Sequence, residues 1–128
     1  VRAVVGVELH PAAVADARRN AADNGIDNAD FHVADIADFL DPVRQAATPW
    51  PDVIVVDPPR AGLHPRVAEA IGASAVRRLV YVSCNPATSA RDCALLREHG
   101  YVVEQVTPVD MFPHTWHIEC VIRLRHLG

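Results

Sequence analysis

The sequence predicts an α/β protein in which strands and helices alternate along the chain and form a doubly wound, mainly parallel sheet. Two observations support this prediction. Short apolar runs rich in β-branched residues, without polar alternation, are typical of strands buried on both faces of a parallel sheet. The segments between them begin at prolines and end near glycines, as helices do. The last two apolar runs have no helix between them, which predicts an antiparallel pair of strands.

The predicted elements can be placed in order. They are a strand from Val4 to Leu9, a helix from Pro11 to about Asn24, a strand from Phe31 to Ala34, a strand from Val53 to Val56, a helix from about Pro65 to Ala73, a strand over Leu79 to Val82, a helix from Thr88 to His99, and strands from Tyr101 to Val109 and from Ile118 to Leu124.

Local chemistry sets the predicted boundaries. In the first helix, one face carries Val14, Ala17 and Ala21. Gly25 is expected to end this helix, and Gly100 is expected to end the last one. A loop with prolines at positions 42, 49 and 51 separates the second and third strands. The final two strands join through the segment Met111-Phe112-Pro113-His114.

Composition limits the possible classes of protein. A chain of 128 residues, 50% of them hydrophobic, fits one domain with a core. All twelve basic residues are arginine, and the net charge of −4 has the wrong sign for a free-standing nucleic-acid binder. No apolar run approaches the length of a bilayer span, and we expect no signal peptide ahead of the first strand. The three cysteines do not suggest a disulfide scaffold, so we expect a reducing, cytoplasmic location.

Four chemically active side chains fall at the carboxyl ends of predicted strands: Glu8, Asp35, Asp57 and Cys84. Open α/β sheets bind ligands at this edge, and a carboxylate there commonly accepts the hydroxyls of a ribose. Each residue also has a plainer interpretation. Glu8 and Asp35 could be solvated loop residues or helix caps, and Cys84 could be a small buried hydrophobe.

Asp57 has an unusual setting because Pro58 and Pro59 follow it. Pro58 restricts Asp57 to extended conformations, and neither proline has a backbone N–H group. A rigid carboxylate of this kind suits binding of a planar base through its N–H, although Asp-Pro-Pro is also an ordinary turn sequence.

The segment from Asp110 to Cys120 is rich in acid–base groups. A zinc site made of His114, His117 and Cys120 would need a helical face, whereas the pattern that follows is that of a strand and sends these side chains to different faces. The sequence therefore predicts no metal site.

Three motifs together resemble one family. Asp-Pro-Pro-Arg-Ala-Gly (57–62), Tyr-Val-Ser-Cys-Asn-Pro-Ala-Thr (81–88) and Asp-Met-Phe-Pro-His-Thr-x-His-x-Glu (110–119) are similar to motifs of the S-adenosylmethionine-dependent RNA 5-methyluridine methyltransferases. These enzymes methylate uracil in ribosomal or transfer RNA. The resemblance implies a Rossmann-like class I methyltransferase sheet, S-adenosylmethionine as cofactor and an RNA substrate.

The resemblance also implies residue roles. Cys84 matches the nucleophile and Glu119 the base. Glu8 matches the ribose-binding acid, Asp35 the residue beside the adenine, and Asp57 the motif carboxylate at the cofactor and the uracil. Cys93 and Cys120 are expected to be replaceable, because they fall within a helix and a strand.

The family's first strand and its Gly-rich turn have no counterpart in the sequence, since no G-x-G-x-x-G spacing occurs. Residues 1–128 are therefore expected to be the carboxyl-terminal part of a catalytic domain. The absent strand would lie between the strands that end at Glu8 and Asp57, so we expect the isolated chain to be inactive or unstable.

Two alternatives remain open from the sequence. The chain could be a non-catalytic truncated fragment of such an enzyme. It could also be an amino-directed nucleic-acid methyltransferase of the Asn/Asp-Pro-Pro-aromatic type, although Arg60 then occupies the aromatic position and Cys84 has no role.

Overall fold

The computed structural model of the protein describes residues 1–41 and 50–128. Its elements are β1 (Val4–Glu8), α1 (Pro11–Asp23), β2 (Ala29–Val33), α2 (Ile36–Phe39), β3 (Val53–Val56), α3 (Pro65–Ser74), β4 (Arg78–Ser83), α4 (Pro86–Glu98), β5 (Tyr101–Val109) and β6 (Glu119–His126). Strands and helices alternate as predicted, up to the final strand pair. The predicted loop prolines at 42 and 49 lie outside the described residues. None of the helices in the described ranges combines the length and apolar character that crossing a membrane requires.

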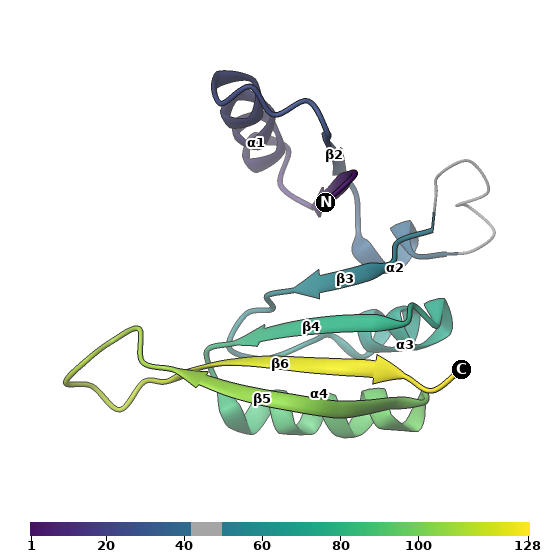
Figure 1. Ribbon diagram of the computed structural model, residues 1–128, viewed down its shortest axis with the longest axis vertical. Coiled ribbons are helices and arrows are strands. Elements are labelled where there is room, and N and C mark those ends of the chain that lie inside the picture. Colours follow the sequence, from purple (N-terminus) through teal and green to yellow (C-terminus); the bar gives the residue numbers. More distant parts are fainter. Residues whose placement is uncertain (42–49) are drawn as a thin grey trace.

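The strands form two sheets (Figure 1). β1 and β2 pair in parallel, and the second sheet has the order β3-β4-β6-β5. Within it β3 and β4 are parallel, while β6 runs antiparallel to both of its neighbours. The predicted antiparallel ending is therefore confirmed, with β6 inserted between β4 and β5.

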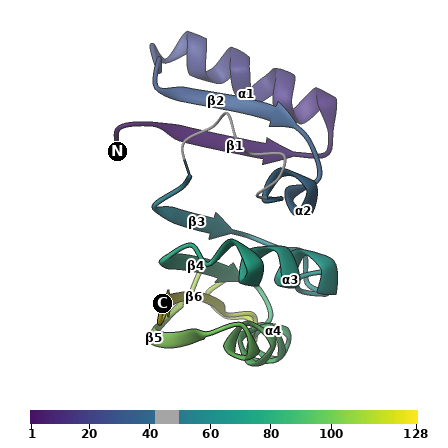
Figure 2. The same cartoon turned by 90° about the vertical axis from the view of Figure 1, so that its right-hand side faces the viewer.

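The division into two sheets lies between β1 and β3, which face each other without pairing (Figure 2). A groove of about 310 Å³ separates them and is lined by residues 5–7 of β1 and 53–55 of β3. The family resemblance places a further strand at this position. That strand remains a prediction, and the groove lies where β1 and β3 do not pair with each other in the described part of the chain.

Burial of the central strands differs from the prediction. Leu79 and Tyr81 of β4 are fully buried together with Ile71 of α3 and Leu96 of α4. On the opposite face, Val55 is 66% exposed. The expectation of strands buried on both faces was wrong, because the helices of the described region that pack on this sheet contribute to one core only.

Helix boundaries follow capping side chains. α4 begins at Pro86, two residues before the predicted start, because the Asn85 side chain accepts a hydrogen bond from the Ala87 amide at 3.1 Å. The predicted stops Gly25 and Gly100 have φ values of 64° and 88°, the left-handed region that glycine tolerates.

Candidate functional site

One open groove brings together the three predicted acids. It lies at the carboxyl ends of β1, β2 and β3, has a volume of about 700 Å³, and is lined by Glu8, Asp35 and Asp57. This is the ligand-binding edge of an open α/β sheet, and the volume falls within the range of small-molecule sites. The sequence prediction that these carboxylates share one edge is confirmed.

Local hydrogen bonds fix two of the acids. A Glu8 carboxylate oxygen accepts a hydrogen bond from the His10 amide at 2.9 Å, and Glu8 is exposed. Asp35 accepts from the Ala37 amide at 2.7 Å and caps α2, a short helix that the sequence analysis did not predict. The helix-cap interpretation of Asp35 is therefore confirmed, and its place on the groove is compatible with an additional ligand contact.

Arg66 brings a cation to the same groove. Its guanidinium lies 3.7 Å from Asp35 and also pairs with Asp38. Sequence reasoning missed this residue, because its acidic partners lie on another element, far earlier in the chain. The pairing leaves the groove with unbalanced negative charge from Glu8 and Asp57, which suits a ligand with hydroxyl donors or a positive centre.

The predicted nucleophile and base lie across one strand pair. In the antiparallel register of β4 and β6, Ser83 pairs with Cys120. Cys84 directly follows Ser83, and Glu119 directly precedes Cys120, so the two residues lie at the same end of this strand pair. Both are half-buried. This end of β4 is also the end where β3 leads into Asp57, because β3 and β4 are parallel.

Ser83 fixes the turn that carries Cys84. Its hydroxyl donates to the Asn85 carbonyl at 2.9 Å and accepts from the Asn85 amide at 3.0 Å, so the two bonds span Cys84. The sequence analysis assigned no role to Ser83, although serine hydroxyls often form hydrogen bonds with nearby backbone groups in turns. Since Asn85 is the N-cap of α4, Cys84 stands directly before the positive end of that helix.

The segment before β6 carries the predicted histidines, of which His117 is half-buried. His114 has a φ of 69° and is exposed, and the His117 ring lies 5.5 Å from the Trp116 ring. Across residues 1–41 and 50–128, no group of three His, Cys, Asp or Glu side chains has the arrangement to hold a metal ion.

Comparison with known sequences identifies close relatives. The sequence profile of the tRNA (uracil-5-)-methyltransferase family matches residues 49–127. An uncharacterized RNA methyltransferase of Porphyromonas gingivalis is 52% identical over 124 residues, and one of Bacteroides thetaiotaomicron is 50% identical over 123 residues. These matches cover 94% and 96% of this chain, which spans only 26% and 27% of the two relatives.

Solved structures give the same result. The Pyrococcus abyssi tRNA (uracil-54, C5)-methyltransferase in complex with S-adenosyl-L-homocysteine superposes with a TM-score of 0.79 and 39% identity, covering 95% of this chain and 28% of that one. The N-methyltransferase NodS of Bradyrhizobium japonicum superposes with a TM-score of 0.74 at 15% identity, over 98% of this chain and 67% of that one. The latter likeness shows the Rossmann-like methyltransferase fold alone.

Proposed function

This chain belongs to the tRNA (uracil-5-)-methyltransferase family, and we propose that it carries the nucleophile, the base and part of the cofactor site of an RNA uracil-C5 methyltransferase. The substrate is a uridine in ribosomal or transfer RNA. The observation that carries the proposal is that a thiol and a carboxylate lie at the same end of the β4–β6 pair, where Cys84 follows β4 and Glu119 begins β6. An amino-directed methyltransferase would have no use for this pair.

S-adenosylmethionine fits the groove by its donor set. The carboxylate of Glu8 can accept the ribose hydroxyls, and Asp35, by the family resemblance, would lie beside the adenine. Asp57 follows β3, the strand that pairs with the strand leading to Cys84. Pro58 and Pro59 add apolar surface to the lining. When bound, this cofactor supplies a methyl group that carbon-5 of the uracil can accept.

Cys84 supplies the electron pair that activates the uracil. Its thiolate adds to carbon-6, the carbon-5–carbon-6 double bond opens, and the electrons move to carbon-5 and the neighbouring carbonyl oxygen as an enolate. The amino end of α4, which begins two residues after Cys84, favours a negative sulfur. The uridine must leave its stack to reach this strand-end site.

Glu119 completes the reaction. After methylation, carbon-5 carries both a methyl group and a proton, and the carboxylate removes that proton. The electron pair of the broken C–H bond re-forms the double bond, and the bond between carbon-6 and sulfur breaks to regenerate the thiolate. The carbonyl next to carbon-5 acidifies the proton, so a carboxylate is a sufficient base.

Residues 1–128 span 26% of the length of the Porphyromonas gingivalis relative, and we propose that they are one part of a larger catalytic unit. The groove between β1 and β3 supports this assignment, since two unpaired parallel-strand edges leave backbone groups without ladder partners. The activity is therefore proposed for the complete gene product.

The test uses RNA that carries 5-fluorouridine at the target position, since fluorine replaces the proton that the base must remove. The complete gene product with S-adenosylmethionine should form an adduct that survives denaturing electrophoresis. Cys84→Ala should abolish the adduct, because no sulfur can add to carbon-6.

Cys93→Ala is the matched control and should retain the adduct, since Cys93 lies inside α4. Persistence of the adduct in Cys84→Ala would disprove the assignment of the nucleophile. Failure of the unsubstituted protein to form an adduct or to methylate uridine would disprove the proposed function as a whole.

A further inference from the structure

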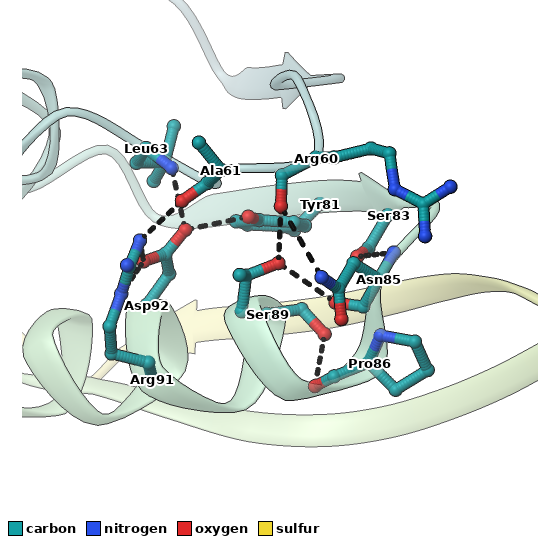
Figure 3. A network of polar contacts seen from close by, with 11 residues as sticks. Arg60, Ala61, Leu63, Tyr81, Ser83, Asn85, Pro86, Ser89, Arg91 and Asp92 are labelled. Carbon is teal, nitrogen blue, oxygen red and sulfur yellow. Dashed lines mark hydrogen bonds and ion pairs between the residues drawn. The ribbon is translucent and has the colours of Figure 1, made fainter.

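One face of α4 holds the backbone of the loop that follows Asp57. This docking face consists of the side chains of Asn85, Thr88, Arg91 and Asp92. They contact the Arg60–Leu63 segment, which joins β3 to α3 (Figure 3). The spacing of these positions corresponds to successive turns of one helix.

Three side chains donate to two carbonyls of the loop. Thr88 Oγ1 shares its hydrogen between the Arg60 carbonyl at 3.1 Å and the Asn85 carbonyl at 3.0 Å, and Asn85 Nδ2 lies 3.4 Å from the Arg60 oxygen. Arg91 Nη2 donates to the Ala61 carbonyl at 2.8 Å. In Figure 3 the Arg60 side chain itself extends away from Asp92, so its guanidinium is not needed for docking.

Asp92 binds the far end of the loop, at Leu63. The residue is 0% exposed, and one carboxylate oxygen accepts from the Leu63 amide at 2.6 Å and from the Tyr81 hydroxyl at 2.7 Å. The other oxygen accepts from Arg91 at 2.7 and 2.9 Å. A buried carboxylate is tolerated only when it is bonded in this way, so the loop amide and the β4 hydroxyl are tied to a single point.

Glycine is required where the loop passes Asp92. Gly62 has a φ of 83°, and a Cβ atom there would collide with Asp92 Oδ2 and with the Arg91 guanidinium. At Gly62 the loop backbone therefore lies too close to the docking face for a residue with a side chain.

We propose that Thr88 and Asp92 are positioning residues, which hold the loop after Asp57 in a fixed place relative to Cys84. This inference rests on the proposed function. The docking face begins at Asn85, one residue after Cys84, and the loop that it holds begins three residues after Asp57. These hydrogen bonds act together with the ladder between β3 and β4 to hold the thiol and the cofactor groove at a fixed separation. Misplacement of reacting groups by about 1 Å can cost roughly 100-fold in rate.

The test compares Thr88→Val with Ser89→Ala in the complete gene product. Valine keeps the shape of threonine and removes the hydroxyl that docks the loop. Ser89 is the matched control, because its hydroxyl bonds only within α4, to the Pro86 carbonyl at 3.0 Å. Single-turnover methylation is measured at saturating S-adenosylmethionine and RNA, alongside the melting temperature and the cofactor dissociation constant.

We expect Thr88→Val to methylate roughly 10-fold or more slowly than Ser89→Ala, with matched melting temperatures. Thr88→Ser should restore the rate to within about twofold, because it returns the hydroxyl. A Thr88→Val rate within about twofold of the Ser89→Ala rate would overturn the inference, as would a loss that Thr88→Ser does not restore. Both outcomes leave the proposed function standing, since the unsubstituted protein still methylates RNA.

Discussion

The three cysteines show how surroundings decide the chemistry of one residue type. Cys84 is half-buried at a strand end, whereas Cys120 is buried within β6. Burial raises the pKa of Cys93 to about 11, and the neighbouring Asp92 carboxylate acts in the same direction. A raised pKa keeps a thiol neutral over a wider pH range, so Cys93 is a poor nucleophile at neutral pH.

Alkylation should follow this pKa. At pH 8 only roughly 0.1% of Cys93 would be thiolate, so iodoacetamide should modify it slowly, with the rate rising about tenfold per pH unit toward pH 11. Mass spectrometry of peptides from the alkylated protein measures the extent at each cysteine. Equal modification of Cys93 at pH 7 and pH 9 would contradict the raised pKa.

The residues that sequence reasoning found are those whose position follows from the local chain. Glu8, Asp57 and Cys84 each stand at the end of an apolar run, and the sheet gathers such ends at one edge. Arg66 and Asp92 were missed because their roles depend on partners from distant elements. A signal for Asp92 does exist, since it shares the core-facing side of α4 with Ser89 and Leu96.

Among the helices and strands, the sequence predicted several boundaries correctly, whereas the prediction of burial was wrong for β3. The predicted bounds of β3 and β5 are confirmed. Both strands are flanked by residues that disfavour strand structure, namely proline, glycine or a charged residue. Burial on both faces failed for β3, since an apolar run reports only that a strand can be covered. Whether a strand face is covered depends on which helices pack against it, and the local sequence of the strand does not show this.

The loop between β3 and α3 gives a stability prediction. In Gly62→Ala the alanine must adopt a positive φ and must also displace Asp92. In Gly25→Ala the alanine must adopt a positive φ, but no atom of the described residues lies within 4 Å of its Cβ. Gly25→Ala should cost about 1–2 kcal/mol, and Gly62→Ala distinctly more.

Thermal unfolding of the two variants in the complete gene product provides the comparison. The melting temperature should fall by several degrees more for Gly62→Ala than for Gly25→Ala. Equal losses would mean that the loop does not depend on close contact with Asp92.

At the scale of the whole molecule, the two sheets carry different parts of the proposed reaction. Glu8 at the end of β1 and Asp35 shortly after β2 line the cofactor groove, whereas Cys84 follows β4 and Glu119 begins β6. β3 links the two parts, since Asp57 lies on the groove while its loop docks on α4. Within residues 1–41 and 50–128, β1 and β3 belong to different sheets and do not pair with each other.

In the proposed reaction, Cys84 adds to the uracil and Glu119 removes the proton from carbon-5. Glu119→Gln tests it most directly, because glutamine keeps the shape of the side chain and loses its basicity. The variant should transfer the methyl group and then stall, so that methylated RNA stays covalently attached to the peptide containing Cys84, as seen by mass spectrometry after nuclease and protease digestion. Normal turnover by Glu119→Gln, together with accumulation of that adduct in His117→Ala, would contradict the account and assign the base to the histidine.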